Sequence, residues 1–139
     1  MIEVHDHEFV RVQVPLSLER SLHLALGSVH APFFTLRDEG ALVVILRRVE
    51  WDRLAPRFAS ALVTAGFRLV SLHPPHLDGA FPARLAAALS VAGLSARLLP
   101  SFHNDHLLVP GGELERTVEA VRPLLAPVDR PPGAADRRG

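Results

Sequence analysis

Two short polar segments, 73–80 and 101–106, contain half of the eight histidines in the chain. Imidazole nitrogens and carboxylates are ligands of first-row transition metals, and an imidazole beside a carboxylate can also act as a general base. The same groups can bind a charged small molecule without any reaction, and they are also common in ordinary turns. The polar residues concerned are His73, His76, Asp78, His103, Asn104, Asp105 and His106.

Metal binding and catalysis both lack a supporting motif. The H-x-x-H spacing in an extended loop fixes no ligand geometry, unlike a histidine pair on a helix. The chain has no cysteine, no G-x-S-x-G sequence and no phosphate-binding P-loop, so the usual nucleophile and nucleotide signatures are absent. We therefore expect a protein without enzyme activity or cofactor. The candidates for a metal site would be His73, His76, His103 and His106.

Ligand binding without chemistry is the third possibility. Segment 73–80 leads into an expected helix, and the amide groups and dipole at a helix N-terminus favour an anion. Gly79 allows a ligand to approach the backbone closely, and the carboxylate of Asp105 could accept a hydrogen bond from an ammonium group. An anion receptor beside a cation receptor suits a zwitterionic amino acid, although a polar turn without function would contain the same residue types.

Patterned strands and helices must position these segments. Apolar residues alternate in 8–14, which predicts a strand, whereas 50–66 has apolar residues at helical spacing with Pro56 inside and Gly66 as its stop. The expected strands are 8–14, 32–36, 41–48, 67–72, 94–99 and 106–109, and the expected helices are 16–29, 50–66, 81–93 and 113–125.

The order strand–helix–strand–strand–helix therefore occurs twice, which predicts an α+β fold of two ferredoxin-like βαββα(β) halves with antiparallel sheets packed against helices. We expect the subdomains at 1–66 and 67–126, and a disordered tail at 127–139, which is rich in proline, glycine and charge. Each half lacks a fourth strand, so the halves complete each other's sheets or pair across a dimer. In this topology 73–80 and 101–106 lie at the same end.

The bulk composition limits the partners. Lys plus Arg equals Asp plus Glu at 15 each, so the basic excess of a nucleic-acid-binding protein is missing. The sequence contains no apolar run approaching the roughly 18 residues that span a bilayer, and its first residues do not have the layout of a signal peptide. We expect a cytoplasmic protein without membrane or nucleic-acid partners, and its zero net charge is compatible with a homodimer.

Several stretches resemble the ACT domain family, specifically the paired ACT proteins that include amino-acid sensors. The most specific is SFHNDHLLVP at 101–110, where a hydroxyl residue, an aromatic, an aspartate and an aliphatic run ending in Val-Pro follow the family pattern. FTLRDEGALVVI at 34–45 is similar to the strand–turn–strand of the family, and the likeness extends from about residue 31 to 125. The resemblance implies tandem ACT subdomains that bind small effectors, usually amino acids, at an interface between subdomains or protomers.

The same resemblance indicates which residues contact the ligand. Ser101, Phe102 and Asp105 match ligand-contacting hairpin positions, and 76–81 matches the loop that surrounds the ligand backbone. The segment HPPHLDG at 73–79 departs from the family by its two prolines and two histidines. The alternatives are a ligand-free oligomerisation module or a His-rich metal-binding protein. The predicted ligand-binding residues are His76, Leu77, Asp78, Gly79, Ala80, Phe81, Ser101, Phe102, Asp105 and His106.

Overall fold

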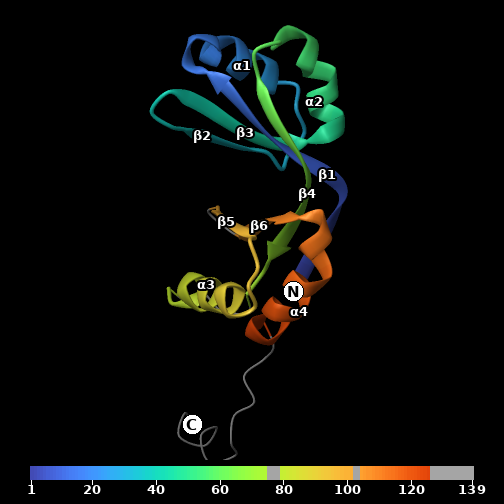
Figure 1. The fold of residues 1–139 in the computed structure, drawn as a ribbon, viewed down its shortest axis with the longest axis vertical. Coiled ribbons are helices and arrows are strands. Elements are labelled where there is room, and N and C mark those ends of the chain that lie inside the picture. Colours follow the sequence, from blue (N-terminus) through green and yellow to red (C-terminus); the bar gives the residue numbers. More distant parts are fainter. Residues whose placement is uncertain (75–78, 102–103, 126–139) are drawn as a thin grey trace, which may run out of the picture.

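A computed structural model describes residues 1–74, 79–101 and 104–125 of the chain. Within these residues six strands form one antiparallel sheet, and four α-helices accompany it (Figure 1). Short 3-10 turns precede α1 and α4 and follow α2. The elements are β1 (Ile2–Pro15), α1 (Glu19–Leu26), β2 (Phe34–Arg37), β3 (Ala41–Arg47), α2 (Arg48–Leu54), β4 (Leu62–Leu72), α3 (Phe81–Val91), β5 (Arg97–Pro100), β6 (Asp105–Pro110) and α4 (Leu114–Leu125).

The two longest strands, β1 and β4, occupy the centre of the sheet, whose order is β2-β3-β1-β4-β6-β5. They pair with each other from Ile2↔Leu72 to Gln13↔Leu62. Residues 9–15 of β1 also pair with β3, and residues 67–72 of β4 pair with β6. Figure 1 shows α1, α2, β2 and β3 in one half of the molecule and α3, α4, β5 and β6 in the other, joined by β1 and β4. The strands of the two halves form one continuous sheet, and the boundary expected after residue 66 falls inside β4.

Alternation along the strands produces a separate core beneath each pair of helices. In β1, Val10, Val12 and Val14 pack with Trp51 and Phe58 in the first cluster. Since successive side chains of a strand point to opposite faces, Phe9 belongs to the face that the helices leave open. The second cluster lies under α3 and α4 and includes Val70, Leu72, Phe81, Leu85, Leu107, Val109 and Val121.

The expected helix 50–66 is wrong beyond its first half. Helix α2 ends at Leu54, a 3-10 turn follows at Ala55–Arg57, and β4 begins at Leu62. Pro56 explains the ending, because its ring lacks an N–H group and clashes with the preceding helical turn. Residues 62–64 instead form strand pairs with β1, and their apolar spacing reflects a strand rather than a helical face.

Gly66 ends no helix, which corrects a second expectation. It lies within β4 with φ of 87°, next to a register shift between Phe9 and Arg11 of β1. A positive φ is readily accessible to glycine, so Gly66 provides the conformation of a β-bulge. The carboxylate of Glu8 accepts a hydrogen bond from the Gly66 amide at 2.8 Å.

Elsewhere the expected and observed elements agree more closely. Helices α3 and α4 occur where 81–93 and 113–125 predict them, and Gly93 ends the former with a positive φ of 68°. Strand β1 starts six residues earlier than expected, and β5 starts three residues later than expected. The tail at 127–139 lies outside the described residues. Among the helices of the described part, none is long and apolar enough to cross a membrane.

Candidate functional site

The end of β4 and the start of β6 bring the two polar segments together. Ser71 is paired with His106 and Leu72 with Asp105 across the two strands. Just beyond them, His73 Nδ1–H donates a hydrogen bond to the amide oxygen of Asn104 at 2.7 Å. The predicted meeting of 73–80 with 101–106 is therefore confirmed for these residues. Five of the predicted residues, His76, Leu77, Asp78, Phe102 and His103, lie outside the described part of the chain.

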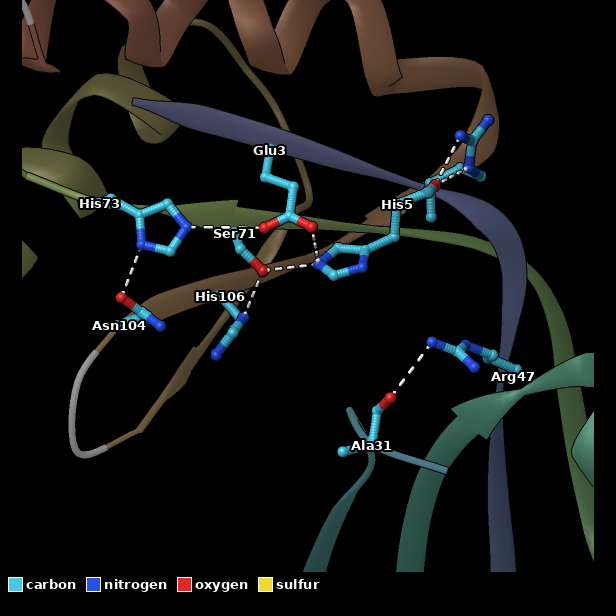
Figure 2. A network of polar contacts seen from close by, with 9 residues as sticks. Glu3, His5, Ala31, Arg47, Ser71, His73, Asn104 and His106 are labelled. Atoms are coloured by element: carbon cyan, nitrogen blue, oxygen red, sulfur yellow. Dashed lines mark hydrogen bonds and ion pairs between the residues drawn. The ribbon is translucent and has the colours of Figure 1, made fainter. Parts of the chain in front are cut away.

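A buried hydroxyl, that of Ser71, joins two histidines beneath this junction (Figure 2). Its Oγ is 2.8 Å from His5 Nε2 and 2.7 Å from His106 Nδ1, and Ser71 is only 2% exposed. A hydroxyl has one proton and two lone pairs, so it donates to one ring and accepts from the other. The two neutral rings must therefore carry their protons on complementary nitrogens.

Ser101, which contacts His106, fixes the direction of these hydrogen bonds. Ser101 Oγ donates to the carbonyl of Asn104 at 2.6 Å, so it can only accept from His106 Nε2, which lies at 3.3 Å. A neutral His106 protonated at Nε2 presents an unprotonated Nδ1, which accepts the proton of Ser71. His5 Nε2–H then donates to Ser71. The bonds run in one direction, from His5 on β1 through Ser71 on β4 and His106 at the start of β6 to Ser101.

Burial favours the neutral form of both of these histidines. It lowers the pKa of His106 below its ordinary value, and the positive charges that His5 and His73 can carry lower it further. Burial also lowers the pKa of His5, while Glu3 acts in the opposite direction. The neutral state agrees with the directed bonds, because a neutral imidazole has one donor and one acceptor nitrogen.

This network connects β1, β4 and β6. Ser71 lies between two imidazoles, and its hydroxyl is buried between β1 and β6. The facing nitrogens of His5 and His106 both bind Ser71. Within the described residues, no group of three or more His, Cys, Asp or Glu side chains could hold a metal ion.

The other predicted ligand-binding residues lie around the network. Gly79 and Ala80 are exposed just before α3, and a Cβ at Gly79 would meet no atom within 4 Å. The side chain of Phe81 is 1% exposed and belongs to the second core, so a ligand could reach only its backbone. Asp105 is half-buried, and within the described part of the chain its carboxylate has neither a hydrogen bond nor an ion pair.

Three residues of the network were missed at the level of sequence. Glu3 and His5 lie on the first half of β1, before the expected start of that strand, and Ser71 lies on β4. Glu3 approaches both histidines, with 3.9 Å to His5 and 3.6 Å to His73. The alternation of Ile2 and Val4 with Glu3 and His5 was the available signal, since it extends the strand toward the N-terminus.

Comparisons with known proteins identify the fold. No family model matches the chain, and no curated protein matches it. Among solved structures, the chain is similar to a putative C-terminal regulatory domain of aspartate kinase from Porphyromonas gingivalis, at 15% identity and a TM-score of 0.70, covering 91% of this chain and 99% of that one. It is also similar to the ligand-free regulatory subunit of aspartate kinase from Thermus thermophilus, at 12% identity and a TM-score of 0.66, covering 90% and 97%.

Two further solved structures are similar to the chain. A Vibrio cholerae protein of unknown function, described as a possible transport protein, matches at 21% identity and a TM-score of 0.69, covering 90% of this chain and 89% of that one. Aspartate kinase from Clostridium acetobutylicum matches at 12% identity and a TM-score of 0.70, and this chain spans 34% of that enzyme's length. The chain therefore has an ACT-like fold, the fold of the regulatory domains of aspartate kinase.

Proposed function

We propose that this chain is a regulatory ACT-type protein without catalytic activity, and that it binds an amino acid where the β4–α3 segment meets the β5–β6 hairpin. The observation that supports this most is the contact of the two segments through His73 and Asn104 at 2.7 Å, next to the carboxylate of Asp105, which has no hydrogen bond or ion pair among the described residues. The fold shared with regulatory domains of aspartate kinase supports the regulatory part of the proposal.

The proposed ligand pose follows from the chemistry of the corner. The carboxylate of the amino acid lies against the backbone at Gly79 and Ala80, where α3 begins. Its ammonium group lies near Asp105, which accepts hydrogen bonds when ionised. Burial lowers the pKa of His106, which favours the neutral ring that does not repel the ammonium group. The remaining contacts come from His76, Leu77, Asp78, Ser101 and Phe102.

The proposal includes the organisation of the protein. Residues 1–66 and 67–126 form two ACT-like subdomains that share β1 and β4, and this sharing supplies the fourth strand of each. The two edge strands, β2 and β5, are short and available for pairing with another copy in a cytoplasmic homodimer.

Calorimetry and thermal-shift measurements with each of the twenty amino acids test the ligand. A ligand at about a hundred times its dissociation constant stabilises the folded protein by about 2.7 kcal/mol. Asp105→Asn removes the charge and keeps the shape, and we expect it to weaken the binding at least tenfold. Asp52→Asn, on α2 in the other half, is the matched control and should bind as the wild type does. Failure of every amino acid to bind, or unchanged binding by Asp105→Asn, contradicts the proposal.

A ligand-free oligomerisation module is the second candidate, and the burial of Phe81 favours it. This side chain is 1% exposed at the first position of α3, so protein atoms already fill the core beneath the proposed corner. Light scattering after size exclusion, combined with the amino-acid screen, separates the two candidates. A stable dimer that no amino acid binds supports the module, whereas a protein that binds an amino acid supports the sensor.

A further inference from the structure

The face of the sheet opposite the helices contains a large groove that the proposed function does not use. Its volume is about 800 Å³, which is within the usual range for small-molecule sites. Its lining residues come from β2, β3 and the turn between them, from β5 and β6, and from the central strand β1. Its lining includes Arg11, Phe34, Leu36, Ile45, Arg97 and Leu108.

The floor of this groove is apolar and belongs to a separate cluster. Ile45 and Leu108 are buried at 7% and 2% exposure, and Phe34 packs against them. Leu36, on the edge strand β2, is 65% exposed and provides a solvent-facing apolar wall. An apolar surface of this kind favours an apolar ligand body, because its burial removes hydrocarbon from water.

Two arginines face the same groove without counter-ions. Arg11 lies on the central strand β1 and is half-buried, and Arg97 lies on the edge strand β5. Within the described residues neither guanidinium has a hydrogen bond or an ion pair. The one acidic residue of the lining, Asp38, has an oxygen bound to the Glu39 amide at 2.8 Å. The lining is therefore net positive, and guanidinium groups bind carboxylates through paired hydrogen bonds.

We propose that this groove is a binding site for an organic carboxylate with an extended apolar body. The carboxylate lies between Arg11 and Arg97, and the hydrocarbon lies over Ile45, Leu108 and Phe34 toward Leu36. A free amino acid is a poor fit, because its ammonium group would lie in a net positive groove. The groove therefore suits a different ligand from the amino-acid site proposed above, and the two proposals are tested independently.

The position of Phe34 separates the two sites in space. Its ring contacts the ring of His106 edge-on, at 5.2 Å between centroids, so the two rings divide the groove from the serine–histidine network. Amide signals of Thr35, Val43 and Leu98 report on the groove, and those of His73 and Gly79 report on the corner. Nuclear magnetic resonance titration of the labelled chain therefore identifies which site a probe occupies.

The experiment compares octanoate with octanol and octylammonium, which share one hydrocarbon chain. We expect octanoate to bind and to shift the groove signals, and the other two to bind at least tenfold more weakly. Arg11→Gln and Arg97→Gln should each weaken octanoate at least tenfold. Arg20→Gln, an exposed arginine on α1, is the matched control and should leave binding unchanged. Arg97→Glu, on the exposed edge strand, reverses the charge and provides a second variant if Arg11→Gln fails to fold.

Four results overturn the proposal. Octanol binding as tightly as octanoate would mean that the groove selects only hydrocarbon. Unchanged octanoate binding in both Arg97 variants would mean that the arginines merely cover apolar surface. Shifts confined to His73 and Gly79 would place the probe in the corner. Absence of octanoate binding to the wild-type chain would mean that the groove takes no carboxylate.

Discussion

Replacement of Ser71 by alanine tests the directed bonds at the candidate site. The hydroxyl makes two hydrogen bonds, at 2.8 Å and 2.7 Å, and the residue is 2% exposed. Each such bond contributes about 0.5–1.5 kcal/mol, so Ser71→Ala should lower the free energy of unfolding by about 1–3 kcal/mol. Water cannot replace the lost partner at a buried position, which keeps the cost within that range or above it.

The corresponding change at Ser101 is the matched control. Ser101 also contacts His106, but it is exposed, so water replaces its lost bonds and Ser101→Ala should change stability by no more than about 0.5 kcal/mol. Urea denaturation followed by the fluorescence of Trp51, the single tryptophan, and by circular dichroism measures both variants. For a chain of this size Ser71→Ala should lower the melting temperature by roughly 3–10 °C. If Ser71→Ala and Ser101→Ala lowered the free energy of unfolding equally, the conclusion that the buried Ser71 hydroxyl stabilises the fold through its two hydrogen bonds would be wrong.

Three further predictions concern pH, a buried hydroxyl and the bulge. Because burial lowers the folded pKa values of His5 and His106 below the unfolded value of about 6.5, their contribution to stability is complete above that value and is lost as the pH falls below it, through the lowered folded values. Unfolding titrations should show this slope, the double variant His5→Gln/His106→Gln should flatten it, and His23→Gln on exposed α1 should retain it. Thr117 is fully buried and its hydroxyl lacks a partner in the described structure, so Thr117→Val should raise the free energy of unfolding by about 1–2 kcal/mol, and a loss in urea denaturation would contradict this. Gly66→Ala should cost about 1–2 kcal/mol from its positive φ alone, because the added Cβ meets no atom within 4 Å; an unchanged urea midpoint would contradict this.

The second half of the chain was predictable because its boundaries carry local signals. Pro82 lies in the first turn of α3, Gly93 follows the helix with a positive φ, and Pro110 ends β6. These residues act through their own backbone preferences, which do not depend on the rest of the fold. The meeting of the two polar segments then followed from the strand order of a split β-α-β unit.

In the stretch 50–66, which was wrongly predicted to be a single helix, the spacing of apolar residues does not by itself decide between helix and strand. Leu54, Phe58 and Leu62 have helical spacing, but Phe58 packs into the first core from an irregular segment, and Leu62 is 68% exposed on β4. A short apolar run fits both the helical and the strand periodicity, and here only the pairing with β1 decides between helix and strand. Pro56 is the local signal against a continuous helix, since proline is incompatible with a regular helix interior.

The missed part of the site was a matter of register. His5 and Ser71 are 66 residues apart and meet only because β1 and β4 pair antiparallel over nearly their full length. A slip of one residue would turn every side chain of a strand to the opposite face. Local sequence specifies that Glu3 and His5 share a face, but not which residues of β4 lie opposite them.

The bulge at Gly66 allows these two strands to serve both halves. In the second half Val70 and Leu72 of β4 point toward α3 and α4, and Val63 is paired with Val12, which points toward α1 and α2. Positions 70 and 63 differ by an odd number, so an unbroken strand would turn one of them away from its helices. The one-residue shift beside Gly66 reverses the alternation between the halves. The shift therefore lets β4 pair with β1 in the first half while Val70 and Leu72 still face α3 and α4 in the second half, next to the strand position of Ser71.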